Sequence, residues 1–205
     1  ALEEQPEDPA VIDRRVSRVL TILAGTDIVF GALTWCCYHL LRNPEVLARA
    51  RDEVRSTELT PPDRRPYLQA VCQEALRIHP PIPVVTRRVI APVSLGGYRL
   101  EPGAYVVGSI LLAHRRPDLF PQPEKFRPER FLERSFSPYE YLPFGGGVRR
   151  CLGQAVGFRQ MAIVLAALLR TFDLTPLGRL GSGFHRRDIM MLPNDSLRVS
   201  FRRRG

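Results

Sequence analysis

The chain has 205 residues, of which 44% are hydrophobic and 25% charged, close to the average of a globular domain. This composition excludes a wholly disordered chain, a collagen-like repeat and a disulfide-stapled miniprotein. The net charge of +9 is compatible with a nucleic acid, a membrane surface or an acidic protein as partner, and charge alone does not choose among them. Nineteen prolines are too many for a simple helical bundle, so we expect rigid coil in the middle of the chain.

The N-terminal part of the sequence predicts a polar segment at 1–10 followed by a long helix at 11–41. Asp27 lies inside this apolar stretch and argues against a membrane span, because a mid-membrane carboxylate is costly. We therefore expect a helix buried within a protein, which neighbours can approach closely at Ala24, Gly25 and Gly31.

Two shorter helices are expected next. Asn43-Pro44-Glu45 has the cap, the N1 proline and the first-turn acid of a helix that runs to Val54. A proline-rich connection at 56–66 precedes a helix at 67–78, which ends at His79-Pro80-Pro81.

The second half of the sequence predicts short strands, coil and one more helix. The strand-like runs, separated by glycine and proline turns, are Val84–Ile90, Val93–Leu95, Tyr98–Leu100 and Tyr105–Val107. A short helix at 108–117, proline-rich coil at 118–143 and a helix at Gln154–Leu169 follow, and a hairpin is expected around Pro193-Asn194-Asp195 with Leu197–Phe201. The arginine-rich end at Phe201–Arg204 is interpreted as solvated.

Several apolar residues and cysteines are predicted to be core. Phe30, Leu33 and Trp35 recur at a helical spacing, and Cys36, Cys37 and Cys72 are interpreted as small core residues. With no CxxC pair and no Cys/His spacing that fits zinc, the cysteines suit free thiols in a reducing compartment.

The segment from Phe144 to Gly153 carries the strongest functional signal. Cys151 follows a glycine-rich turn and comes just before a predicted helix, whose free N–H groups favour a thiolate. Gly147 and Gly153 permit close approach of a flat ligand, and Arg149 can pair with an anionic group at its edge. A phosphate-cradling loop is the alternative, but the Lys-Ser/Thr of a P-loop is missing.

The spacing F-x-x-G-x-R-x-C-x-G from Phe144 to Gly153 resembles the haem-binding loop of the cytochrome P450 family. Three further segments agree in order: Glu74-Ala-Leu-Arg77 matches the family's E-x-x-R, Phe126–Phe131 resembles its PERF segment, and Ala24-Gly25-Thr26-Asp27 resembles its oxygen-binding stretch. The resemblance covers roughly residues 11–205. It implies the C-terminal, haem-binding half of that fold, mainly α with small antiparallel β-sheets.

The resemblance assigns roles to individual residues. It implies Cys151 as the axial iron ligand of heme b, a propionate contact for Arg87 or, one position on, Arg88, and a network in which Arg130 completes the Glu74–Arg77 pair. Asp27 is interpreted as a proton-relay acid or as a buried salt-bridge partner.

Two departures from the family pattern stand out. Ile28 occupies the place where the family usually has threonine after the acid, and Thr26 lies about 200° away around the helix. The family's N-terminal half, which supplies much of the substrate pocket and any membrane anchor, is absent from this sequence.

The function that the resemblance implies is a haem-thiolate monooxygenase, which inserts one atom of dioxygen into a small organic substrate. Its electrons would come from NAD(P)H through an acidic redox partner such as a ferredoxin or a flavoprotein. The alternatives are a peroxide-using or redox-neutral haem-thiolate enzyme, suggested by Ile28, and an inactive truncated fragment. We expect a cytoplasmic protein, with an anchor in a missing half left open. No nucleic-acid partner is expected, because no basic patch is interleaved with aromatic residues.

Overall fold

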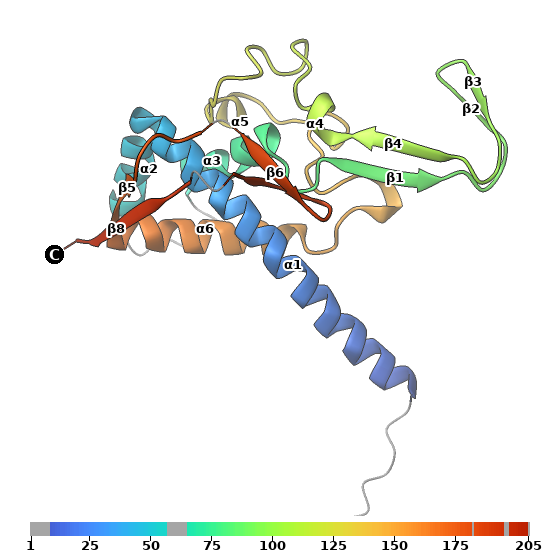
Figure 1. Ribbon diagram of the computed structural model, residues 1–205, viewed down its shortest axis with the longest axis horizontal. Helices are drawn as coiled ribbons and strands as arrows, with labels where there is room; N and C mark the ends of the chain where they lie inside the picture. The colour runs from blue at the N-terminus through green and yellow to red at the C-terminus, as the bar shows by residue number, and fades with distance from the viewer. Residues whose placement is uncertain (1–8, 57–64, 182, 195–196, 205) are drawn as a thin grey trace, which may run out of the picture.

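The computed structural model describes residues 9–56, 65–181, 183–194 and 197–204, and within the first helix it describes side chains from Gly25 onward together with Asp13. These parts of the chain contain four long helices, three of them consecutive, and short strands that form four separate antiparallel pairs (Figure 1). The fold is therefore mainly helical with small antiparallel sheets, as the sequence predicts. The polar segment before Pro9 and most of the predicted 56–66 connection lie outside the described residues.

The core lies where three helices meet the C-terminal half of α1 (Pro9–Arg42). These are α2 (Pro44–Ser56), α3 (Pro66–Ile78) and α6 (Gln154–Thr171). The apolar positions of α3 recur every three or four residues, and Leu68, Val71 and Ala75 are entirely buried. Burying one Val or Leu side chain contributes about 1.5–3 kcal/mol, so the buried face of α3 is a main source of stability.

Helix α1 crosses the fold, and its N-terminal half extends beyond the other elements (Figure 1). Gly31 and Trp35, one turn apart, contact strand β7 (Met190–Pro193). A Cβ on Gly31 would lie 2.8 Å from Leu192 Cδ2, and Trp35 Nε1 donates a hydrogen bond to the Met191 carbonyl at 2.9 Å. Gly31 thus permits the close approach that the sequence predicts.

Each strand pairs either with its neighbour in the chain or across an intervening hairpin. Strand β1 (Val84–Arg88) pairs with β4 (Tyr105–Ser109), and the β2–β3 hairpin projects from the far end of this ribbon (Figure 1). Gly96 and Gly97 adopt φ of 58° and 83° in the hairpin turn, values that glycine reaches without strain. The bounds of the hairpin strands are Val93–Leu95 for β2 and Tyr98–Leu100 for β3.

A long irregular segment connects β4 to α6. Its described course contains two four-residue α-helices, α4 (Ile110–Ala113) and α5 (Arg130–Glu133), and one 3₁₀ turn at Gly147–Arg149. The helix predicted at 108–117 is shorter because residues 108 and 109 belong to β4, and Ser109 Oγ accepts the N–H of Leu112 to cap α4.

The predicted C-terminal hairpin is wrong. Strand β8 (Val199–Arg203) pairs with β5 (Phe172–Pro176), which follows α6, while β7 pairs with β6 (Phe184–Arg187). The turn-forming residues at Pro193 and Asn194 therefore end one strand pair and lead to another; Asp195 lies outside the described residues.

Most of the predicted core residues on α1 are buried; the exceptions are Phe30, which is exposed, and Cys37, which is half-buried. Leu33, Trp35 and Cys36 are at most 6% exposed, whereas Phe30 is 62% exposed because no described element covers that side of the helix. None of the helices in the described parts of the chain is long and apolar enough to cross a membrane.

Candidate functional site

The segment from Phe144 to Gly153 folds into a loop closed at its neck. The backbone N–H of Cys151 donates to the carbonyl of Phe144 at 3.0 Å, and a single 3₁₀ turn, η2 (Gly147–Arg149), lies inside the loop. Gly145 and Gly147 have φ of 71° and 67°, a left-handed conformation that costs other residues about 1–2 kcal/mol. Glycine at these two positions therefore determines the path of the chain toward Cys151.

The Cys151 thiol is exposed, three residues before the first residue of α6. Gly153 passes beside it, since a Cβ there would lie 3.7 Å from the Cys151 sulfur. The thiol borders an open cavity of about 520 Å³ that is lined mainly by apolar side chains and by one guanidinium: Val148, Leu152, Ala155, Phe158 and Arg150.

The loop contacts α1 through a glycine on α6. A Cβ on Gly157 would lie 3.7 Å from the ring of Phe144 and 4.0 Å from the side chain of Val29. The predicted oxygen-binding stretch therefore lies on the part of α1 that meets the start of α6. Asp27 is exposed and Ile28 is half-buried. Asp27 forms no ion pair within the described residues, so no buried salt bridge is seen for it there.

Gly25 and Ala24 are the first two residues of the predicted oxygen-binding stretch. Gly25 has nothing within 4 Å of the position a Cβ would take, so this side of α1 is open. Ala24 belongs to the same helical turn, but its side chain lies outside the described part of α1.

Strand β1 borders the same loop. The side chain of Val85 approaches Gly145, at 3.7 Å from the position of its Cβ. Because side chains alternate along a strand, Arg87 shares the face of Val85, whereas Arg88 points to the other face. The geometry thus places Arg87, and not Arg88, on the face of β1 that borders the loop. The side chains of both Arg87 and Arg149 are exposed.

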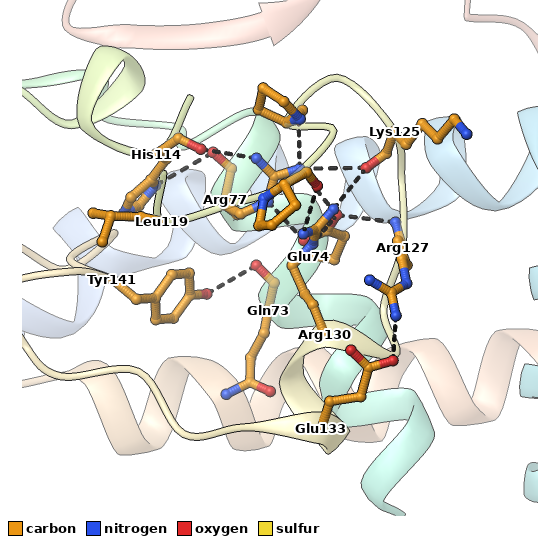
Figure 2. A network of polar contacts seen from close by, with 12 residues as sticks. Gln73, Glu74, Arg77, His114, Leu119, Lys125, Arg127, Arg130, Glu133 and Tyr141 are labelled. Atoms are coloured by element: carbon orange, nitrogen blue, oxygen red, sulfur yellow. Dashed lines mark hydrogen bonds and ion pairs between the residues drawn. The ribbon is translucent and has the colours of Figure 1, made fainter. Parts of the chain in front are cut away.

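The Glu74 carboxylate is the centre of a fully buried polar network (Figure 2). It accepts hydrogen bonds from Arg77 Nε at 2.7 Å and Nη2 at 2.9 Å, and from Arg130 Nε at 3.0 Å. The backbone N–H of Arg127 is a fourth donor, at 2.9 Å. The structure therefore brings together the three residues that the resemblance groups, Glu74 and Arg77 from α3 and Arg130 from the start of α5, 56 residues after Glu74.

The guanidinium groups of this network also bind the proline-rich coil. Arg77 donates to the carbonyls of His114 and Pro123 at 2.8 and 2.7 Å, and Arg130 donates to that of Pro121 at 3.2 Å. These carbonyls belong to residues without regular secondary structure, so the arginines satisfy backbone acceptors that no helix or strand satisfies.

His114 is a site residue whose role the sequence reasoning missed. It is completely buried; its Nδ1 lies 3.3 Å from the Arg77 carbonyl, and its Nε2 accepts the N–H of Leu142 at 2.9 Å. An accepting Nε2 requires the proton on Nδ1, which can then donate to the Arg77 carbonyl. Burial lowers the pKa of His114 to about 4, which keeps the ring neutral. His114 thus connects α3 to the residues just before Phe144.

A second buried pair of rings fixes α1 against α3. His39 Nε2 and His79 Nδ1 are 2.9 Å apart, and Trp35 stacks on the His79 ring with centroids 3.7 Å apart. Burial, with the positive charges of Arg115 and Arg77, lowers the pKa of His79 to about 3. Both rings are therefore neutral at pH 7, as a hydrogen bond between two imidazoles requires.

An exposed thiol on a glycine-shaped loop, with an apolar cavity beside it and arginines nearby, is the arrangement expected of a haem-thiolate protein. The comparison with known sequences specifies the class. The chain belongs to the cytochrome P450 family, whose sequence pattern matches residues 13–200.

Individual relatives agree with this assignment. The chain is 36% identical over 199 residues to a putative cytochrome P450 137 of Mycobacterium tuberculosis, an alignment that covers 97% of this chain and 40% of the relative. It is 35% identical to the putative cytochrome P450 135B1 of Mycobacterium bovis, over 90% of this chain and 39% of the relative. A 2-hydroxyisoflavanone synthase of Glycine max is 35% identical, over 77% and 34% of the two chains. The chain thus spans about two fifths of the length of these mycobacterial relatives.

Membership of the family implies a haem, and the residues of the loop fit one. The thiol of Cys151 is a soft ligand suited to iron and is exposed next to an apolar cavity. Gly147 leaves open space, since nothing lies within 4 Å of the position of its Cβ. Exposed guanidinium groups at Arg149 and Arg87 suit the carboxylates at the edge of the macrocycle.

Proposed function

We propose that residues 11–205 form the haem-binding half of a monooxygenase that inserts one atom of dioxygen into a small organic substrate. The haem, when bound, supplies the redox chemistry, and its electrons originate in NAD(P)H. The observation that carries the proposal is the exposed Cys151 thiol on a loop whose neck hydrogen bond and two left-handed glycines fix its position.

Cys151 would be the residue that binds the haem iron, and the other loop residues support it. Phe144 packs on Gly157 and holds the loop against α6, while Gly147 and Gly153 leave space for a planar group. Arg149 and Arg87 would hold the propionates of the haem, because guanidinium groups pair with carboxylates through charge-assisted hydrogen bonds.

The residues on α1 control water and protons beside the loop. Gly25, which follows the small residue Ala24 in the sequence, leaves open space on its side of α1, and Asp27 is the carboxylic acid that can hold a proton there. Ile28 cannot donate or accept a hydrogen bond, so it excludes water from the position next to the acid.

The test of the iron ligand is Cys151→Ser in the complete protein that contains this chain. We expect loss of the thiolate-type absorption band of the reduced carbon monoxide complex. Cys37→Ser is the matched control, because it changes another cysteine, which lies on α1. An unchanged band in Cys151→Ser would refute the assignment, as would loss of the band in both variants at equal folded fraction.

A peroxide-using enzyme is the second candidate, and Ile28 is the observation that favours it. Peroxide brings its own protons and electrons, so turnover with it does not need the hydroxyl that the family usually has next to the acid. Turnover by peroxide that exceeds turnover by NADPH and redox partner would support this candidate. Turnover by NADPH and redox partner that exceeds turnover by peroxide, and that Ile28→Thr does not increase, would support the monooxygenase.

The redox partner in this proposal is an acidic ferredoxin or flavoprotein that docks beside the Cys151 loop. Arg150 and Arg159 are exposed there, whereas Arg115 and Arg116 form ion pairs with Glu124 and Asp118. Electron transfer should slow as ionic strength rises, because salt screens charges over about 8–10 Å. A rate indifferent to salt and to the double change Arg150→Glu and Arg159→Glu would contradict this docking surface.

A further inference from the structure

The arginine-rich C-terminal strand is part of a charged cluster and not only a solvated end. Asp173 on β5 is the register partner of Arg202 on β8, and alternation along the strand puts Arg204 on the same face as Arg202. Arg51 reaches the same carboxylate from α2. Three guanidinium groups from two elements thus converge on one carboxylate.

The single carboxylate cannot serve three guanidinium groups equally. Arg204 takes its hydrogen bonds, with Nε and Nη2 at 2.8 and 2.6 Å from Asp173 Oδ1. Arg51 Nη2 lies 3.6 Å from the same oxygen, and Arg202 Nη2 lies 3.8 Å from Oδ2. The latter two contacts are longer than hydrogen bonds.

Arg51 is left with a buried edge that lacks acceptors. Its Nε and Nη2 atoms are buried and have no hydrogen-bond partner within the described part of the chain. These two nitrogens form the edge of the guanidinium that pairs with two oxygens of one carboxylate or phosphate. Burial and the nearby charge of Arg204 lower the pKa of Arg51.

We propose that Arg51, Arg202 and Arg204 form a binding site for a phosphate-type dianion, as free phosphate or as the phosphomonoester of a lipid headgroup. The three positive charges exceed the one negative charge of Asp173 by two, which a dianion balances. Arg51 and Arg204 are 19% and 20% exposed and form the base of the site. Arg202 is 84% exposed and lies at its rim, where it can close over the bound oxygens.

The test is thermal unfolding of the full chain in inorganic phosphate and in sodium chloride of matched ionic strength. We expect phosphate to raise Tm by about 5–10 °C at a concentration 100 times its Kd. Arg51→Gln should abolish this rise without lowering Tm in chloride, because it removes a charge that lacks hydrogen bonds. Arg99→Gln is the matched control, since it removes an exposed arginine paired with Glu101 and should keep the full response.

Equal Tm values in the two salts would overturn the proposal, as would an undiminished phosphate response in Arg51→Gln. Line broadening of the phosphate ³¹P resonance by the folded chain, absent with Arg51→Gln, gives a second readout that does not depend on unfolding.

Vesicles of phosphatidylcholine with and without phosphatidic acid distinguish a lipid headgroup from free phosphate as the source of the dianion. Sedimentation of the chain with only the acidic vesicles, lost in Arg51→Gln, would assign the site to a lipid headgroup. A phosphate response without such sedimentation would assign it to free phosphate.

Discussion

Replacing Glu74 by alanine tests whether the buried network supports the fold. The carboxylate is completely buried and accepts four hydrogen bonds, three of them from guanidinium groups that are themselves at most 4% exposed. Without it, Arg77 and Arg130 remain as two buried positive charges facing each other. Removing one partner of a buried pair costs about 3–5 kcal/mol. That is a large share of the roughly 5–15 kcal/mol by which a domain is stable.

The assay is urea unfolding of the full chain followed by circular dichroism, with Tm as a second readout. For a domain of this size about 1 kcal/mol shifts Tm by roughly 2–4 °C, so Glu74→Ala should lower Tm by about 6–20 °C. Glu74→Gln keeps the shape and one acceptor but loses the charge, and it should lie between wild type and Glu74→Ala.

The matched control is Glu101→Ala. Glu101 accepts from Arg99 Nε at 2.8 Å, close to the 2.7 Å of the Arg77 contact, but both side chains are more than 60% exposed. An exposed pair of this kind contributes about 0–1 kcal/mol. If Glu74→Ala destabilised the chain no more than Glu101→Ala, burial would not strengthen the network and the reasoning would be refuted.

Three further predictions concern the same part of the fold. Arg77→Lys should cost about 3 kcal/mol in urea unfolding, because lysine has three donors and no planar edge; an effect below 1 kcal/mol would contradict this. The folded pKa of His114, about 4, lies below the ordinary value of 6.5. Its contribution to stability is therefore complete above pH 6.5 and is lost as pH falls toward 4. His114→Asn should accordingly flatten the fall of unfolding free energy between pH 6.5 and 4.5, and an unchanged slope would count against a neutral His114. Gly147→Ala should cost about 1–2 kcal/mol because of its left-handed backbone, whereas Gly153→Ala, outside the left-handed region, should cost less.

The helices and the loop could be predicted because their signals are local. The apolar spacing of α3 and the Pro44 start of α2 specify helices within a few residues, and the glycines near Cys151 specify the turn before α6. The pairing of Glu74 with Arg130 could not come from spacing, since 56 residues separate them, and it rested on the family resemblance.

Long-range packing explains what the sequence did not predict. The turn signal at Pro193-Asn194 is local, but β8 gains a complete ladder by pairing with β5 at the end of α6. The role of His114 could not be predicted, because a single histidine in a sequence does not reveal that its two ring nitrogens will bridge α3 and the cysteine loop. Phe30 has the helical spacing of a core residue, but no described element covers it.

The proline-rich coil between α4 and α5 has more backbone acceptors than donors, because Pro117, Pro121, Pro123 and Pro128 carry no N–H. The arginine side chain has five hydrogen-bond donors and no acceptor, so Arg77 and Arg130 supply donors to the excess backbone acceptors of this segment. The order of these residues therefore depends on these two side chains together with local turn hydrogen bonds, such as those from the N–H of Phe120 to Arg116 and from the N–H of Lys125 to Gln122. Such a segment should open as a single cooperative unit. Local opening would then expose the whole coil to a protease at once. The cleavage rate of the folded chain would measure how often the hydrogen bonds from the two arginines to the backbone carbonyls break.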